Sequence, residues 1–396
     1  MADVLIAGGG IAGSALAIML GRAGLTVELF EQCHFPREKP CGEGLMPGGV
    51  GVLERLGIAE AVGGAPFNGV RYYTGSLVVE GCFPTIAGTP AMGRGQRRRQ
   101  LDQVLFAAAA ATPGVIAQTG MRVDAPLCER GRVVGLIVTG QARRAPLVVA
   151  ADGAHSRMRR LLQLDAPPPR RRRVGLRTHF RLAGGQAQPP WVEVFLGRGY
   201  ELYVTPLPGD ELLVAGLAER ASVVGGAEAC LRRWIAEQPI LCERLIGAQQ
   251  CSAMLGMSPL GIRAHAGVAP GIVLLGDAAG ALDPITGGGM AQALLTAELL
   301  AHYVTQQWEC GDGWLLAYDR ARRALLRDEQ LLTQFVLGLA AHPWLAQQAL
   351  RLLHAAPALF SYLIAVAAGV RSPWPAATAP PLHRTHPEAH SCRDRD

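Results

Sequence analysis

The chain has 396 residues, and its 49% hydrophobic content and 49 glycines suit a large core with many tight turns. The net charge of +6 comes from short arginine clusters without a recognition module or interleaved aromatic residues, which argues against a nucleic-acid partner. The nine cysteines are odd in number and contain no C-x-x-C pair, so we expect reduced thiols, no metal site and a cytoplasmic protein.

The N-terminus predicts a strand–helix–strand unit. Val4–Ala7 is a short apolar run typical of a buried strand, and Ile11–Ala23 shows the apolar spacing of a helix. Thr26–Phe30 predicts a second strand that ends at Glu31. The first strand begins so close to Met1 that we expect no signal peptide.

The loop between the first strand and the helix has the pattern G-x-G-x-x-G, formed by Gly8, Gly10 and Gly13. Such glycines permit the tight turn, a close approach of the backbone to a pyrophosphate, and close packing of helix on strand. Glu31 stands where a carboxylate can bind the ribose hydroxyls of an adenosine. The unit therefore predicts a bound dinucleotide.

The middle of the chain predicts strands in two groups, separated by a helix. We expect strands over Val70–Phe83 and within Arg122–Ala151, and a helix over Gln100–Ala111. Arg173–Ala218 is a run of short strands broken by glycine and proline, which favours a mainly antiparallel sheet.

Two more apolar strands end in polar, glycine-containing turns. Leu147–Ala151 is followed by Asp152-Gly153, and Ile272–Leu275 by Gly276-Asp277. After the second of these, a glycine-rich turn leads into a helix that begins near Gly289. The free N–H groups at a helix start suit a group that becomes anionic, such as a reduced flavin.

The C-terminal third predicts helices over Ala227–Leu245 and Ala291–Val370. The segment 352–370 has nearly the length of a membrane span, but His354 and Pro357 interrupt it. We therefore expect a packed helix here, with peripheral membrane contact as the alternative. Residues 372–396 are rich in proline, histidine and charge and are expected to be disordered.

These elements predict an α/β protein with an interrupted Rossmann-like domain, an inserted, mainly antiparallel sheet domain and C-terminal helices. We see no second G-x-G-x-x-G in a strand–helix context, and hence no separate nicotinamide domain. The expected division is 1–69, 96–165 and 258–300 for cofactor binding, 70–95 and 166–257 for substrate, 301–371 for the helices, and 372–396 for the tail.

Three separated motifs resemble the group A flavoprotein superfamily, which includes aromatic and polyketide hydroxylases, geranylgeranyl reductases and flavin-dependent halogenases. The motifs are G-x-G-x-x-G at 8–13 with Glu31, A-D-G-A-H-S-x-x-R at 151–159, and G-D-A-A-G at 276–280. Arg98-x-x-Leu101-Asp102 is similar to the superfamily's arginine at a helix start. The resemblance covers roughly residues 1–300 and implies a single FAD under an inserted sheet.

The resemblance also implies roles for single residues. Glu31 would bind the adenosine ribose, and Asp277 a ribityl hydroxyl or the pyrophosphate. The amides of 287–289 would face flavin N1 and the C2 carbonyl and stabilise the anionic reduced ring. The expected cofactor-binding residues are Gly8, Gly10, Gly13, Glu31, Arg37, Cys41, Arg98, Asp152, Gly153, Gly276, Asp277, Gly287, Gly288, Gly289 and Met290, with Pro284, Gly287, Gly288 and Gly289 at the catalytic positions.

Two segments are similar to the reductases and halogenases of the superfamily. They are the loop 35–44, which contains Cys41, and D-P-I-T-G at 283–287. In reductases of this kind a cysteine in the loop can lie near the flavin; the alternative for Cys41 is a small buried thiol. Aromatic hydroxylases more often carry a histidine where this chain has Gly280.

The signatures of both groups are nevertheless missing. Halogenases carry W-x-W-x-I-P and geranylgeranyl reductases Y-x-W-x-F-P, whereas this chain, aligned on Pro206, has Glu201, Tyr203 and Thr205. Halogenases also use a lysine between flavin and substrate, and the chain's only lysine, Lys39, lies in another segment. These differences argue against a halogenase.

The resemblance implies an FAD monooxygenase that uses NAD(P)H and O2. It would hydroxylate a hydrophobic aromatic, polyketide or quinone-type small molecule through a flavin C4a-hydroperoxide. An FAD-dependent reductase of C=C bonds, similar to geranylgeranyl reductase, is the alternative. A halogenase or a non-catalytic flavin-binding scaffold is less favoured, because a scaffold has no need of the amides at 287–289.

The substrate is expected between the flavin and the inserted sheet. The apolar sheet and C-terminal helices favour a hydrophobic molecule. Aromatic residues that alternate along strands are also common in cores, and a histidine between Thr178 and Phe180 can be structural. The expected lining residues are Tyr73, His179, Glu193, Tyr200 and Tyr203.

Overall fold

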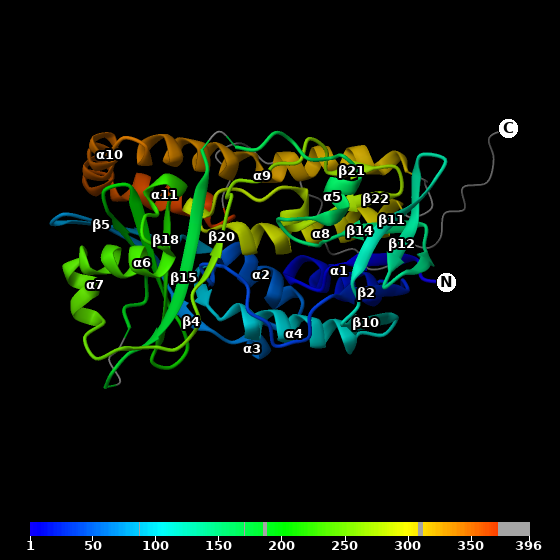
Figure 1. Ribbon diagram of the computed structural model, residues 1–396, viewed down its shortest axis with the longest axis horizontal. Coiled ribbons are helices and arrows are strands. Elements are labelled where there is room, and N and C mark those ends of the chain that lie inside the picture. Colours follow the sequence, from blue (N-terminus) through cyan, green and yellow to red (C-terminus); the bar gives the residue numbers. More distant parts are fainter. Residues whose placement is uncertain (87, 170, 185–187, 308–311, 371–396) are drawn as a thin grey trace.

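The computed structural model describes residues 1–86, 88–169, 171–184, 188–307 and 312–370. Two sheets lie side by side along the long axis of the molecule, and helix α9 (Gly313–Ala340) runs along both (Figure 1). The predicted tail at 372–396 lies outside the described residues.

The first sheet has six strands in the order β10-β2-β1-β14-β22-β21. All neighbours pair in parallel except β21, which is antiparallel to β22. Every residue of β1, β14 and β22 is buried, as expected for central parallel strands covered on both faces. The bounds are β1 Val4–Ala7, β2 Val27–Glu31, β10 Val115–Thr119, β14 Leu147–Ala150, β21 Val268–Ala269 and β22 Ile272–Leu274.

Helices cover one face of this sheet, and a small antiparallel sheet covers the other. The helices α1 (Ile11–Arg22), α4 (Arg98–Ala110) and α8 (Gly289–Gln307) share one apolar core with the sheet. On the opposite face, Val133, Leu136 and Val138 pack against Leu5 and Val148. The small sheet consists of β11 Val123–Glu129, β12 Arg132–Val138 and β13 Gln141–Arg144. The predicted Rossmann-like α/β architecture is therefore confirmed.

The second sheet has eight strands in the order β19-β15-β18-β17-β16-β5-β6, with β20 also paired to β15. Its pairs are antiparallel except β16 with β5, so the predicted mainly antiparallel sheet is present. The bounds are β5 Gly69–Thr74, β6 Leu77–Cys82, β15 Arg173–Arg181, β16 Val192–Leu196, β17 Tyr200–Pro206, β18 Glu211–Glu219, β19 Gln249–Gln250 and β20 Leu255–Met257.

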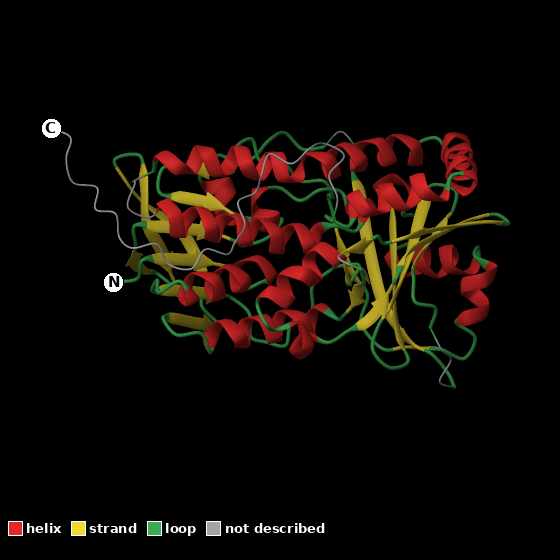
Figure 2. Ribbon diagram, turned by 180° about the vertical axis from the view of Figure 1, so that it is seen from behind, coloured by secondary structure: helices red, strands yellow, loops and turns green. Residues whose placement is uncertain are grey.

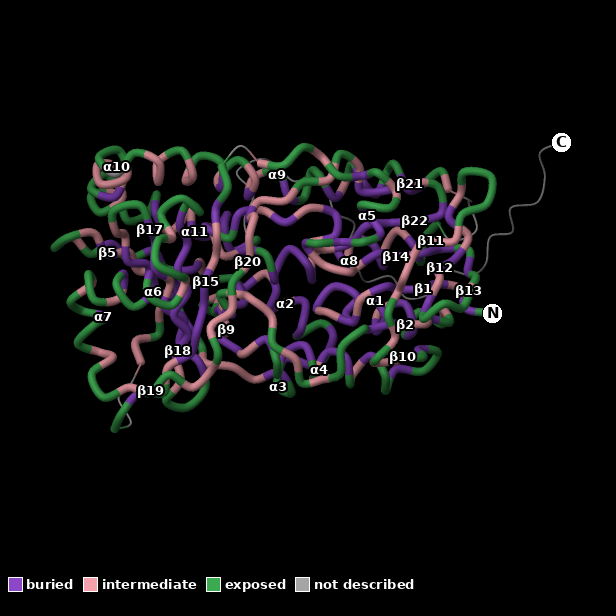
Figure 3. Tube along the Cα trace, in the orientation of Figure 1, coloured by how far each residue is buried: buried purple, intermediate pink, exposed green. Residues whose placement is uncertain are grey.

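Both faces of the second sheet are covered by helices (Figure 2). On one face, Trp234 and Leu231 of α6 (Ala227–Ala236) and Leu241 of α7 (Pro239–Arg244) pack on β17 and β18. On the other, Phe360 and Ile364 pack on β5, β6 and β16. Buried residues concentrate in the two sheets and the helices between them, whereas the outer turns of α7, α9 and α10 are exposed (Figure 3).

The C-terminal helical region is divided where the chain contains glycine or proline. After α8 and α9, α10 (Pro343–Ala355) and α11 (Pro357–Ala367) meet at Ala356 with a bend of 112°. Among the described helices, none alone has the length and apolar content to cross a membrane; α10 and α11 meet these criteria only when taken together.

The remaining elements connect the two sheets. Glu43 and its neighbours lead into a short three-stranded sheet, β3-β9-β4. The bounds of these elements are β3 Gly44–Leu45, α2 Pro47–Arg55, α3 Ala59–Val62, β4 Ala65–Phe67, β7 Thr85–Ile86, β8 Thr89–Pro90, β9 Gly93–Gly95, α5 Arg157–Leu161, and the 3-10 turns η1 Arg220–Ser222, η2 Gly276–Ala279 and η3 Pro284–Thr286.

Alanine at Gly13 tests the packing of α1 on β1. A Cβ at Gly13 would lie 2.0 Å from the carbonyl oxygen of Gly8, so we expect Gly13→Ala to lose about 3 kcal/mol of unfolding free energy or more. Gly51→Ala is the matched control, because it is also helical but meets only the end of Arg55. Alanine there should stabilise by about 0.5–1 kcal/mol. Urea unfolding measures both changes, and equal midpoints would contradict the packing described.

Candidate functional site

Three strand ends meet at one edge of the parallel sheet. Because β1, β14 and β22 are parallel neighbours, the turns that follow them lie side by side. Arg159 holds the second and third turns together. Its guanidinium is buried and donates to the carbonyl oxygens of Ala154 at 2.7 Å and Ala278 at 3.0 Å. The positions of these two turns relative to each other therefore depend on a buried side chain as well as on the sheet.

The first turn exposes free amides around a fixed carboxylate. The backbone N–H groups of residues 10–13 have no acceptor among the described residues. Glu31 accepts hydrogen bonds from the N–H groups of Gly9 and Cys33, each at 3.0 Å. A Cβ on Gly10 would meet nothing nearer than Arg37 at 3.5 Å. The helix start is thus open to an anion.

The second turn begins with Asp152, which caps α5. Its Oδ2 accepts the N–H groups of Arg157 at 2.7 Å and Met158 at 3.1 Å, whereas its buried Oδ1 has no partner among the described residues. Gly153 follows in a left-handed conformation and lines the cavity at the sheet edge. Asp152 itself is not among the described residues that line this cavity, and its hydrogen bonds fix the start of α5.

The third turn is built by Asp283, which caps η3 through a 3.2 Å bond to the N–H of Ile285. Gly287 then takes a left-handed conformation with φ of 76°. The N–H groups of residues 288–290, at the start of the 19-residue helix α8, have no acceptor among the described residues. A Cβ on Gly289 would meet no atom within 4 Å, so space in front of these amides is open.

The loop 37–42 brings the ammonium group of Lys39 and the thiol of Cys41 to the same cavity. Lys39 Nζ lies 3.4 Å from Asp277 Oδ2, and both side chains are partly exposed to the cavity. Arg37 contacts Glu31 at 3.5 Å and Asp102 at 2.9 Å. Arg98 makes a second ion pair with Asp102, and it lines the cavity together with Cys41. These cations suit the phosphates of a dinucleotide.

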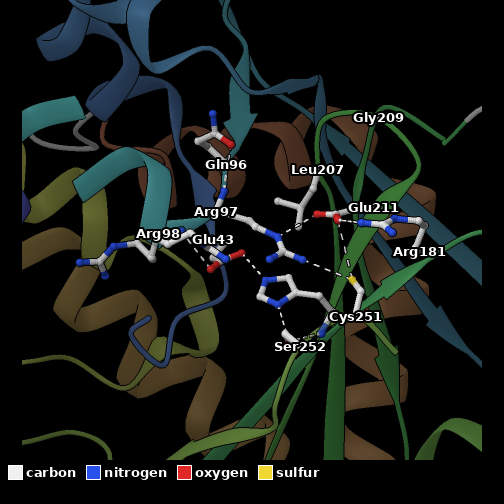
Figure 4. Close-up of polar contacts among 12 residues, drawn as sticks. Glu43, Gln96, Arg97, Arg98, Arg181, Leu207, Gly209, Glu211, Cys251 and Ser252 are labelled. Carbon is white, nitrogen blue, oxygen red and sulfur yellow. Dashed lines mark hydrogen bonds and ion pairs between the residues drawn. The ribbon is translucent and has the colours of Figure 1, made fainter. Parts of the chain in front are cut away.

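A buried polar cluster fixes this loop against β15 (Figure 4). Glu43 has a positive φ of 57°, unusual for a residue other than glycine, and it is fully buried. One carboxylate oxygen accepts the N–H of Arg98 at 3.0 Å, and the other lies 2.7 Å from Nε2 of His179. His179 Nδ1 in turn lies 2.7 Å from Ser252 Oγ. His179 therefore supports the loop. It lines neither the cofactor cavity nor the larger cavity described next.

A second, larger cavity of about 1130 Å³ lies between the second sheet and the helices α9, α10 and α11. It adjoins the cofactor cavity, since five residues line both: Met46, Val192, Tyr203, Thr286 and Gly287. Most of its other lining side chains are aliphatic or aromatic, among them Tyr72, Val194, Leu332, Leu353, Phe360 and Ile364. An apolar molecule in this cavity would meet the cofactor at the third turn.

The structure brings only some of the predicted substrate residues to this cavity. Tyr200 and Tyr203 line it. Tyr73 and Glu193 lie on the opposite face of the sheet, where the Tyr73 hydroxyl donates to Glu193 at 2.6 Å and Arg244 pairs with the same carboxylate. The reason is the alternation of side chains along a strand, which turns Tyr72 to the cavity and Tyr73 away.

Sequence reasoning missed several residues that the cavities contain. From the sequence, Lys39 served only to argue against a halogenase, because it lies in another segment than the halogenase lysine. In the structure it lies beside Asp277. Glu329 comes from α9 and packs against Gly288, where a Cβ would lie 1.7 Å from its carboxylate. Its Oε1 has no partner within the described part of the chain. No local sequence motif predicts these contacts, because they join segments that are distant in sequence.

The donor set fits FAD. Free amides at two helix starts, a lysine and two arginines near the first and third turns, and open space beside Gly10 and Gly289 match a phosphate chain and a ring that becomes anionic. Asp277 lines the cavity beside Lys39, whereas Glu31 lies at the first turn and is not among the described residues that line the cavity.

Comparison with known proteins agrees with this geometry. Residues 1–175 match a family described as an FAD binding domain. The chain is 28% identical to a menaquinone reductase of Mycolicibacterium smegmatis, over 83% of this chain and 80% of that enzyme. It is 30% identical to a squalene epoxidase of Aspergillus fumigatus over 74% of this chain but only 64%, less than two thirds, of that enzyme. A flavoprotein/dehydrogenase from Cytophaga hutchinsonii has the same fold, with a TM-score of 0.82, 22% identity, and coverage of 93% and 92% of the two chains.

The buried carboxyl of Glu329 generates a pH-dependent prediction. Burial raises its pKa from 4.5 to about 7, against smaller opposing effects of Gln292 and Thr286. Below pH 4.5 the carboxyl is protonated in both the folded and the unfolded protein, so its ionisation does not lower the free energy of unfolding. Between 4.5 and 7 it ionises only in the unfolded chain, so its contribution to stability falls by about 3 kcal/mol as pH rises.

Glu329→Gln removes this titration. Relative to the original protein, the variant should gain about 3 kcal/mol more at pH 8 than at pH 4, as measured by urea unfolding. Glu60→Gln, at a side chain that is 95% exposed, is the control and should change by less than about 0.5 kcal/mol. A Glu329→Gln effect that does not vary with pH would show that the carboxyl is ionised in the folded protein.

Proposed function

The chain belongs to the group A flavoprotein superfamily and is an FAD-dependent oxidoreductase; within this class we propose that it is a monooxygenase of a large hydrophobic molecule. Its electron donor is NAD(P)H, its co-substrate is O2, and its substrate occupies the cavity between the second sheet and α9–α11. The substrates named for the relatives, squalene and menaquinone, are likewise large and apolar.

The observation that carries the proposal is the contact between the two cavities. The 1130 Å³ cavity reaches the cofactor cavity at Tyr203, Thr286 and Gly287, directly beside the amides expected to face flavin N1. When bound, the flavin supplies the transfer of electrons from NAD(P)H to oxygen and thereby the oxidising power for the substrate.

The chain's own residues orient the substrate and exclude water. Aliphatic side chains of α10 and α11 hold the body of the molecule, and Tyr203 stands at the junction with its hydroxyl donating to the carbonyl of Ile285 at 3.0 Å. Pro284 and Gly287 shape the side of the turn where oxygen must arrive. A dry, closed junction favours transfer to substrate over loss of the oxidant to water.

Product analysis tests the proposal. The FAD-loaded protein is incubated with NADPH and, in turn, squalene, a menaquinone and a long-chain alkylphenol, with and without oxygen. We expect an oxygen-dependent product that gains one atom of ¹⁸O from ¹⁸O2, detected by mass spectrometry. An anaerobic product that gains two hydrogens would contradict oxygenation.

A second function, reduction of a C=C bond, is favoured by Cys41. Its thiol lines the cofactor cavity, where its S–H group is a proton donor for the substrate carbon, and its sulfur accepts the N–H of Glu43 at 3.4 Å. Reduction requires such a donor, whereas oxygenation does not.

Cys41→Ala separates the two functions. Under oxygenation the variant should keep its turnover within about threefold, because the thiol takes no part. A fall of about 10²-fold or more, with FAD binding unchanged, would instead identify a general acid and favour the reductase. Cys230→Ala serves as control, since that thiol is buried away from both cavities.

We also infer that the larger cavity opens toward a lipid surface. Phe335, Trp344 and Leu352 line it and are still more than 60% exposed, so its mouth is apolar. Such a patch at the entrance of an apolar cavity suits a substrate that partitions into membranes.

Sedimentation with phosphatidylcholine vesicles tests this surface. The protein should bind neutral vesicles, and Trp344→Glu should weaken binding at least threefold, because a charge would enter the lipid interface. Ile246→Glu, 72% exposed but away from the cavity, should leave binding unchanged. Equal losses from both variants would show that the mouth is not the contact.

A further inference from the structure

The large apolar cavity contains one buried charged side chain, that of Glu201 on β17. Among the residues that the structure describes, three charged ones line this cavity, and two of them, Arg198 and Glu237, are exposed at its rim. Glu201 is 8% exposed. A carboxyl group inside an apolar cavity is costly unless it is paired or binds a polar group of the ligand.

Glu201 has one partner and one free oxygen. Its Oε2 pairs with Arg173, whose guanidinium also pairs with Asp283 at 2.6 Å. Its Oε1 has no partner among the described residues, and the side chain keeps 11% exposure to the cavity. The free oxygen is therefore available to a hydroxyl of the bound molecule.

The charges around Glu201 favour the uptake of a proton. One guanidinium lies between two buried carboxylates, so the cluster carries a net charge of −1 when both are ionised. Burial raises the pKa of Glu201 to about 7, with Arg173 opposing and Asp283 adding to the shift. The phenols of Tyr72 and Tyr203 also face this group, and burial raises the pKa of each. A proton on Glu201 makes the cluster neutral.

The same cluster reaches the cofactor turn. Asp283 Oδ1 accepts both Arg173 and the N–H of Ile285, and Tyr203, two residues from Glu201 on the same face of β17, donates to the carbonyl of Ile285. Two residues along a strand span about 7 Å. A ring whose hydroxyl binds Glu201 therefore lies beside the third turn, with its apolar chain in the rest of the cavity.

Position 201 is also where this chain departs from the halogenase and reductase signatures. Aligned on Pro206, both signatures carry an aromatic residue where this chain has a carboxylate. The exchange replaces an apolar side chain with a hydrogen-bond acceptor two residues from Tyr203, which lines both cavities.

We propose that Glu201 binds and deprotonates a hydroxyl group of the substrate, so that the preferred substrate is a phenol with a long apolar chain. In this step the O–H bond of the phenol breaks, its proton passes to Glu201 Oε1, and the electron pair stays on the phenolate oxygen. The phenolate is richer in electrons at its ring carbons, which is what oxygen insertion needs. The inference rests on the proposed monooxygenase function of the same site.

The experiment compares binding and turnover of a long-chain alkylphenol and its methyl ether by the FAD-loaded protein. The original protein should bind the phenol at least tenfold more tightly than the methyl ether, because only the phenol can donate a hydrogen bond to Glu201. Glu201→Gln should bind the phenol at least tenfold more weakly and turn it over about 10²-fold more slowly. Glu201→Asp, which keeps a carboxyl, should recover part of both, whereas Glu60→Gln, at an exposed side chain outside both cavities, should change neither.

Recognition of the hydroxyl by Glu201 and oxygenation of the substrate can be separated experimentally. Glu201-dependent binding of the phenol without an oxygenated product would contradict the monooxygenase and keep the recognition of the hydroxyl. Oxygenation of squalene or of the methyl ether, with no effect of Glu201→Gln on any probe, would keep the monooxygenase and overturn this proposal. The flavin absorption spectrum and thermal midpoint of each variant show whether it is folded.

Discussion

The site depends on the parallel pairing of β1, β14 and β22. Parallel neighbours end at the same edge of a sheet, so the three turns that follow them are adjacent although they lie far apart in the sequence. The buried Arg159 reinforces this arrangement, because it donates to carbonyl groups of two of the turns. With the turns fixed, two helices begin with free amides directed at one cavity, and FAD binding follows from that placement.

The second sheet forms one wall of the larger cavity, which adjoins the cofactor cavity. Its apolar face and the helices α9–α11 enclose a cavity of about 1130 Å³, which meets the cofactor cavity at the turn before α8. The ends of a parallel sheet form the cofactor site, and a mainly antiparallel sheet with amphipathic helices encloses the larger cavity. The apolar mouth and the buried Glu201 together fit an amphiphile, with its chain toward the helices and its polar end toward the flavin.

The local sequence was sufficient to predict the strands and the glycine-containing turns that follow them. The glycines at 8, 10 and 13, the acid at 31 and the two later strand ends lie where their motifs indicated, because a strand followed by a glycine turn has few alternatives. The face of the sheet to which a single side chain points could not be predicted from local sequence. Tyr72 lines the cavity and Tyr73 does not, since that choice depends on the register of β5 beside β16. Glu329 was missed because α9 reaches Gly288 only through tertiary packing.

Binding of FAD to two glycine variants tests the central claim most directly. Gly10 and Gly289 lie in different turns, and a Cβ on either would enter open space, so alanine at each leaves the protein folded but occupies the expected cofactor volume. Fluorescence titration should give one FAD per chain for the original protein and at least tenfold weaker binding for both Gly10→Ala and Gly289→Ala. If only one variant weakens binding, or if the original protein binds no FAD, the three turns do not form a single cofactor site.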